Sequence, residues 1–182
     1  MKRAIITSPA LAPAALTELK DWLGITVASE DAALTIQLRA ALESCEAFTG
    51  IMPLESECEE VLPVCGDWMR LEASPVSAIT GVQAIPAQGP RTALAVTDYA
   101  LDFAADGSGR VRVFNPGLAQ RIAVRFTAGL AASWSALPDG MRHGVIRLAA
   151  QQYRQREGDN ASQLPPAAVA ALWRPWRRMR LT

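Results

Sequence analysis

Along the chain the spacing of hydrophobic residues changes from helical to β-like and back to helical. This change constrains the fold more than any other feature. Within residues 30–48 the apolar residues recur at steps of four and three, the spacing of one face of an α-helix. They are Leu34, Leu38, Ala41, Cys45 and Phe48. The same spacing predicts helices over 14–23 and 141–156, with Pro13 and Gly24 suited to the first turn and the C-cap of the first helix.

Between the second and third predicted helices, residues 54–129 form short β-prone runs that are separated by turn residues. Alternation is clearest in 110–114 and 121–127, where apolar residues occupy one side and arginines the other. The runs are 68–72, 78–85, 99–103, 110–114 and 121–127. They predict a small antiparallel sheet of about five strands in hairpin order.

The predicted fold class is therefore α+β. We expect a helical body, made of two N-terminal helices and a long third helix, with the small antiparallel β-sheet inserted between them. In this interpretation residues 1–157 form a single domain. Residues 158–182 form a tethered C-terminal arm that is helical at first and extended after Pro175, because proline interrupts a helix.

The sequence contains few of the residue combinations that form an enzyme active site. Its single histidine, His143, has no nucleophile or carboxylate readable as a partner, and the Gly-rich segment 106–110 lacks the lysine and the following helix of a phosphate loop. The sequence therefore predicts no catalytic residues, no cofactor and no metal site, and a small enzyme is the weakest alternative. No apolar run is long enough to span a membrane, and the three cysteines form no C-x-x-C pair, as in proteins of reducing compartments.

Charge is balanced overall but unevenly distributed. The chain has 18 Lys+Arg and 18 Asp+Glu, yet residues 1–60 carry ten acids against four bases and residues 139–182 carry eight bases against three acids. Such a polarity favours head-to-tail contacts between copies, or a cationic arm that reaches another protein. Glu55, Glu57, Glu59 and Glu60 cluster in a candidate strand and predict a solvated acidic face, with a hard cation bridging subunits as the alternative.

The C-terminal segment concentrates the residue types that are most enriched at protein interfaces. Two tryptophans and four arginines fall within eight consecutive positions, and Trp and Arg are the commonest anchors where one protein binds another. We therefore expect this segment to bind a partner protein. Two alternatives stay open: Trp173 and Trp176 pack onto their own domain, or Arg177, Arg178 and Arg180 bind nucleic-acid phosphates.

Several segments, taken in order, carry a resemblance to a known family. Leu-Lys-Asp-Trp-Leu stands at 19–23, Glu-Ala-Phe-Thr-Gly at 46–50 and Ser-Pro-Val-Ser-Ala-Ile at 74–79. Phe-Thr-Ala-Gly follows at 126–129, and Leu-Pro-Pro opens the arm at 164–166. Over nearly its whole length the chain resembles the head–tail connector (adaptor) proteins of long-tailed bacteriophages and gene transfer agents.

The resemblance implies a ring, usually of twelve copies, that docks beneath the portal protein at one capsid vertex. Such a ring extends the DNA channel, through which DNA passes without sequence-specific binding, and offers a platform to the next neck, stopper or tail protein. It also implies a location in the neck of a virion or virus-like particle that assembles in the bacterial cytoplasm. The main alternative is a small nucleic-acid-binding module that uses the basic C-terminal region.

Two sets of residues acquire roles from this resemblance. Residues of the arm are expected to bind the portal: Leu172, Trp173, Trp176, Arg177, Arg178, Arg180 and Leu181. Three carboxylates are expected to face the channel and repel the DNA backbone: Glu55, Glu57 and Glu59.

Overall fold

The computed structural model describes residues 3–7, 11–155 and 165–177. The chain divides into two compact units. One, here the β unit, comprises residues 1–9 and 55–130, and the other, here the helical unit, comprises residues 10–54 and 131–182. Each unit therefore contains two stretches of sequence.

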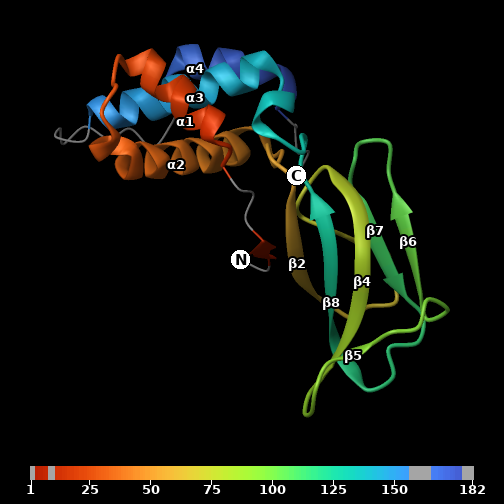
Figure 1. The fold of residues 1–182 in the computed structure, drawn as a ribbon. Helices are drawn as coiled ribbons and strands as arrows, with labels where there is room; N and C mark the ends of the chain where they lie inside the picture. The colour runs from red at the N-terminus through yellow and green to blue at the C-terminus, as the bar shows by residue number, and fades with distance from the viewer. Residues whose placement is uncertain (1–2, 8–10, 156–164, 178–182) are drawn as a thin grey trace. The chain divides into compact units, whose positions relative to one another are not determined.

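The helical unit is organised around one central helix, α3. Its elements are α1 (Pro13–Leu23), η1 (Ala28–Glu30), α2 (Asp31–Thr49), η2 (Trp134–Ala136), α3 (Asp139–Arg154), α4 (Ala167–Trp173) and η3 (Arg174–Trp176). Helix α3 contacts α1, α2 and α4 (Figure 1). Because it is surrounded by other helices, α3 buries residues on most of its circumference, from Met141 to Ala150.

Local sequence signals explain where the first two helices begin and end. Pro13 occupies the first turn of α1, where its missing N–H costs nothing. Gly24 and Gly50 end α1 and α2 in the left-handed region, each with φ 71°, a conformation that glycine adopts without strain. The stripe predicted for the second helix is buried as far as Cys45, and its apolar side faces the core of the unit.

The β unit contains strands that pair antiparallel throughout the described residues. They are β1 (Arg3–Thr7), β2 (Ser56–Pro63), β3 (Met69–Arg70), β4 (Val76–Pro86), β5 (Thr92–Ala93), β6 (Tyr99–Phe103), β7 (Gly109–Val113) and β8 (Ala119–Ala128). One sheet has the order β1-β2-β8-β4-β5 and the other β3-β7-β6 (Figure 1). Strand β8, between β2 and β4, contributes five fully buried residues: Ile122, Ala123, Val124, Phe126 and Ala128.

The strand content corrects the predicted architecture. The α+β class holds, but the described residues contain four α-helices and eight strands in two sheets, so the prediction of one small sheet of about five strands is wrong. Three strands, β1, β2 and β5, were not among the predicted runs, for physical reasons. Strands β1 and β5 are short and mostly exposed, and β2 carries glutamates at positions where strands usually show β-branched or aromatic residues.

The described part of the chain contains no helix long and apolar enough to cross a membrane.

Candidate functional site: the C-terminal arm and strand β2

The arm packs onto the central helix of its own unit. Trp173, the last residue of α4, is fully buried, and its indole Nε1 donates a hydrogen bond of 3.2 Å to the backbone carbonyl of Met141. Gly144 of α3 makes this position possible. A Cβ atom there would lie 2.9 Å from both Cδ1 and Cε2 of the indole, and closer still to Nε1.

The second tryptophan lies one turn of α3 away from the first. Trp176 in η3 is half-buried, and a Cβ on Gly140 would come within 3.1 Å of its Cη2 atom. Gly140 and Gly144 are four residues apart in α3, so they lie on the same helix face. The two indoles therefore pack against two successive positions at which α3 has no side chain.

An aromatic contact links the arm to α2 as well. The ring centroids of Phe48 and Trp173 are 6.1 Å apart with an interplanar angle of 47°. On the same Phe48 ring, the guanidinium carbon of Arg177 lies 5.1 Å from the centroid, the geometry of a cation–π contact. Phe48 of α2 thus contacts both Trp173 and Arg177, and these contacts join α2 to the end of the described arm.

The structure places the predicted portal-binding residues in different environments. Trp173 is buried and Arg177 is exposed, while Leu172 and Trp176 are half-buried. The remaining predicted positions lie outside the described residues: Arg178, Arg180 and Leu181. The alternative that the tryptophans pack onto their own domain therefore describes Trp173 fully and Trp176 in part.

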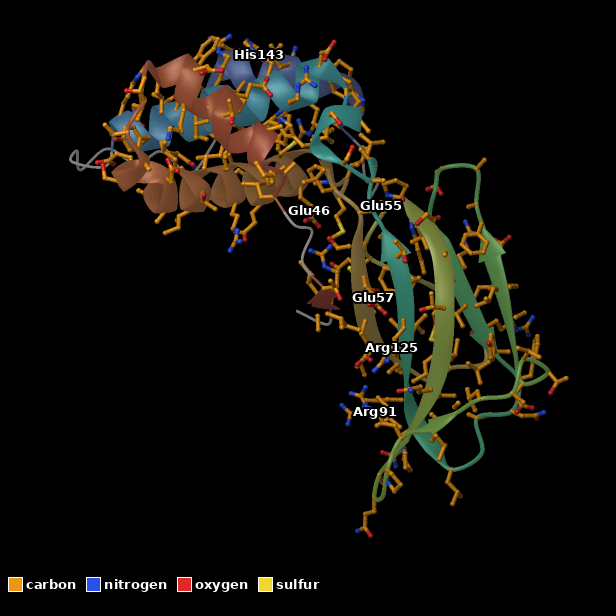
Figure 2. The ribbon with its side chains drawn as sticks, viewed as in Figure 1. Glu46, Glu55, Glu57, Arg91, Arg125 and His143 are labelled. Atoms are coloured by element: carbon orange, nitrogen blue, oxygen red, sulfur yellow. The ribbon has the colours of Figure 1, made fainter. Side chains whose placement is uncertain are left out.

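Strand β2 separates its glutamates onto two faces. Glu59 lies on the outer face of the five-stranded sheet, where its carboxylate binds the guanidinium of Arg91 at 2.6 Å and that of Arg125 at 3.1 Å. Figure 2 shows Arg91 and Arg125 at the β unit, near the strand that carries Glu57. Glu57 is half-buried and accepts a hydrogen bond of 3.3 Å from the Thr7 hydroxyl. Glu55, also half-buried, precedes the strand.

The two arginines determine the electrostatic character of this face. Partial burial alone would raise the pKa of Glu59, but the hydrogen bonds and the Coulombic attraction from Arg91 and Arg125 outweigh it and hold the pKa below its ordinary value. Two cations against one anion give this trio a formal charge of +1. Glu59 therefore adds no net negative charge to the sheet face.

The neighbouring Glu60 points into the β unit and has a different role. Its side chain is 1% exposed, and its carboxylate accepts backbone hydrogen bonds from Glu72 at 2.9 Å and from Ala73 at 3.0 Å. Burial raises the pKa of Glu60 above its ordinary value, and the backbone donors offset only part of that rise. Glu60 fastens the bend before β4 to strand β2, a contact that no local sequence pattern indicates.

The groups considered for catalysis have packing roles in the described residues. His143 (Figure 2) meets the ring of Trp22 edge-on, with centroids 5.2 Å apart and planes at 83°. Burial raises the pKa of the Cys45 thiol to about 12, so this thiol is protonated and unreactive at neutral pH. No group of three or more potential metal ligands occurs among the residues that the structure describes.

The full-length fold identifies the class of protein. No protein-family profile and no curated protein matches the chain. Solved structures do match. One is the neck of an empty gene transfer agent (GTA) particle computed with C6 symmetry, with a TM-score of 0.80 and 30% sequence identity, and the match covers 100% of this chain and 98% of that chain. A second is the virion of a native GTA particle (TM-score 0.75, 32% identity, 100% and 98%). A third is the neck of a native GTA particle computed with C12 symmetry (TM-score 0.74, 30% identity, 98% and 97%).

These matches define a structural component of a virus-like particle, a class set by the fold of the whole chain rather than by a catalytic site. The chain belongs to the family of neck proteins of gene transfer agent particles. The predicted location in the particle neck is confirmed by this membership.

Proposed function

We propose that this protein is a head–tail adaptor of the particle neck. In this role it forms a ring under the portal, extends the DNA channel and offers a docking platform to the next neck or tail protein. The observation that carries the proposal is that neck structures match the chain from end to end in both units. Neck structures computed with C6 and C12 symmetry support a ring of several subunits, and we propose twelve copies.

The arm is the proposed contact with the portal protein. Its described end presents the exposed Arg177 and the partly exposed Trp176 and Leu172, and the chain then continues into Arg178, Arg180 and Leu181. Cationic and aromatic residues of this kind anchor on acidic, apolar surfaces. Trp173 is buried in its own unit, so its proposed contribution is to hold α4 in place.

The role proposed for the β2 carboxylates depends on their surroundings. Glu55 and Glu57 keep the proposed position beside the DNA channel, where negative charge would prevent DNA from adhering. Glu59 is proposed to lie beside the channel only together with Arg91 and Arg125, as part of a patch with a formal charge of +1. Unchanged DNA packaging after charge reversal at Glu55 and Glu57 together would count against a channel-facing role.

The experiment that tests the proposal is co-sedimentation of the protein with its portal ring. The structure fixes where the arm has to be cut. Truncation after Gln163 would remove Trp173 from the core, so the informative truncation is after Arg177, which leaves α4 and η3 in place. We expect the full chain to bind and the chain ending at Arg177 to lose at least about tenfold in affinity, about 1.4 kcal/mol.

A matched control separates the loss of specific contacts from the loss of charge. The truncation removes two arginines, so the control replaces the exposed Arg39 and Arg154 of the helical unit with alanine. This control is expected to bind the portal like the full chain. If neither the full chain nor the control binds, the adaptor proposal fails, and a salt-dependent titration with duplex DNA becomes the test of the nucleic-acid alternative.

A further inference from the structure

Two glycines of α3 face two tryptophans of the arm. Gly140 and Gly144 are separated by one helical turn. Trp176 lies beside Gly140, and Trp173 lies beside Gly144. A glycine inside a helix is normally unfavourable because it gains more freedom on unfolding than alanine does. Gly144, in the interior of α3, therefore calls for a packing reason, and the indole ring of Trp173 provides it.

The two glycine positions are not equally tight. At Gly144 a Cβ would overlap the indole of Trp173, whose atoms are ring atoms of a buried side chain that cannot move aside. At Gly140 a Cβ would lie 3.1 Å and 3.3 Å from Cη2 and Cζ3 of Trp176, which is half-buried and can shift by a few tenths of an ångström. The packing therefore excludes any side chain larger than glycine at position 144, but it can accept a Cβ at position 140.

A polar contact and two ring contacts extend this packing to the end of the described arm. The Trp173 indole is held by its hydrogen bond to the Met141 carbonyl of α3. Phe48 contacts this ring, and Arg177 in turn lies over the ring of Phe48. The position of Trp173 in the glycine seat is therefore linked, through Phe48, to the point from which the chain continues into its last residues.

We propose that the glycine seat, formed by Gly140 and Gly144, is a positioning element for portal attachment, with Gly144 as its decisive residue. The seat sets where and in which direction the C-terminal segment leaves the helical unit, so that all copies in a ring present this segment alike. Identical presentation allows several weak contacts to act together. This inference rests on the proposed adaptor function, because it assigns a means of alignment to the portal-binding segment.

The sign of one substitution tests the seat. At an unconstrained helix position Gly→Ala strengthens the helix. In Gly144→Ala the seat instead forces Trp173 out, so amide hydrogen exchange in residues 167–173 is expected to rise at least about tenfold, because α4 opens locally. Gly140→Ala is expected to change this exchange less than about threefold, since Trp176 can shift.

Second-site rescue separates positioning from general damage. A phenylalanine lacks the pyrrole edge that meets Gly144, so Gly144→Ala combined with Trp173→Phe is expected to restore slow exchange and portal binding relative to Gly144→Ala alone. Gly81→Ala in β4 serves as the control, because no atom lies within 4 Å of the added Cβ. It should leave both measurements unchanged.

Portal co-sedimentation completes the test. Gly144→Ala is expected to lose about tenfold or more in portal affinity, in parallel with its raised exchange. Unchanged exchange in Gly144→Ala would show that the seat does not exist, and raised exchange with wild-type portal binding would show that the seat does not position the segment. Failure of the wild-type chain to bind the portal would instead overturn the adaptor function, and with it this role of the seat. The two failures are distinguishable because exchange is measured without the portal.

Discussion

The two units each fasten a short segment with one buried side chain, but they use opposite chemistry. In the helical unit the neutral indole of Trp173 holds α4 by filling a space and donating to the Met141 carbonyl. In the β unit the carboxylate of Glu60 holds the bend before β4 by accepting two backbone N–H groups. The first attachment depends on volume and the second on charge.

This difference predicts the perturbation to which each unit is most sensitive. Loss of volume in a packed core costs transfer energy and leaves a cavity, and neither term depends on pH. The ionisation of a buried carboxylate such as Glu60, in contrast, is linked to folding and therefore depends on pH. The helical unit should therefore be sensitive to side-chain truncation, and the β unit to pH.

The largest expected effect comes from removing the indole. Trp173→Ala should lower the free energy of unfolding of the helical unit by about 3–5 kcal/mol, measured as the denaturant dependence of the helical circular dichroism signal. Trp22→Ala is the matched control, because Trp22 is 46% exposed and contacts His143 at the surface. Similar losses in the two variants would contradict the volume-dependent attachment of α4.

An intermediate effect is expected from Glu60. Glu60→Ala leaves the buried Ala73 N–H without its acceptor and should cost about 1–3 kcal/mol, measured by amide exchange in residues 71–76. Its stability should also lose a pH dependence that the wild type has. Because the pKa of Glu60 is raised in the folded state, the native protein keeps a proton that the unfolded chain releases, so stability falls as pH rises from the ordinary value through the folded pKa.

As pH rises over that interval, the stability of the wild-type β unit should fall relative to that of Glu60→Ala. If it does not, the assigned role of the carboxylate is contradicted.

The smallest effect is expected at the exposed ion pairs of Glu59. Arg125→Ala should destabilise the β unit by less than about 1 kcal/mol, with the difference shrinking in high salt, because the arginine is nearly half exposed. The pH dependence has the opposite sign to that of Glu60. The pKa of Glu59 is lowered, so its contribution is present above the ordinary pKa and is lost as pH falls through the folded value.

Denaturant unfolding of Arg125→Ala at acid and neutral pH measures this contribution. Arg110→Ala is its control, since the Arg110–Asp102 pair is longer, at 3.9 Å. A loss in Arg125→Ala that grows on acidification would contradict the predicted sign.

The sequence predicted those parts of the fold that local signals determine. The helices α1 and α2 begin and end within one residue of their predicted bounds, because proline, glycine and the helical period act within a few residues. Strand β2 was not predictable in the same way. Glu60 faces inward only because the distant bend at Glu72 and Ala73 supplies its donors.

The candidate site was predictable in composition but not in arrangement. The Trp and Arg content of the arm indicated an interface, and the residue types alone did not show that Trp173 has an internal partner. That partner is Gly144 of α3, and two glycines four residues apart are too common in sequences to indicate a seat. The spacing becomes informative only when α4 is seen beside α3.

The short bridge between Leu54 and Ala131 gives the β unit a modular character. These two residues end the first stretch of the helical unit and begin its second, and the amide of Ala131 also bonds to the Pro53 carbonyl at 3.1 Å. The two residues pair in a parallel bridge, so residues 55–130 leave and re-enter the helical unit side by side. In topological terms residues 55–130 are an insertion between the two stretches of the helical unit, and this insertion is completed by the N-terminal strand β1, which pairs with β2.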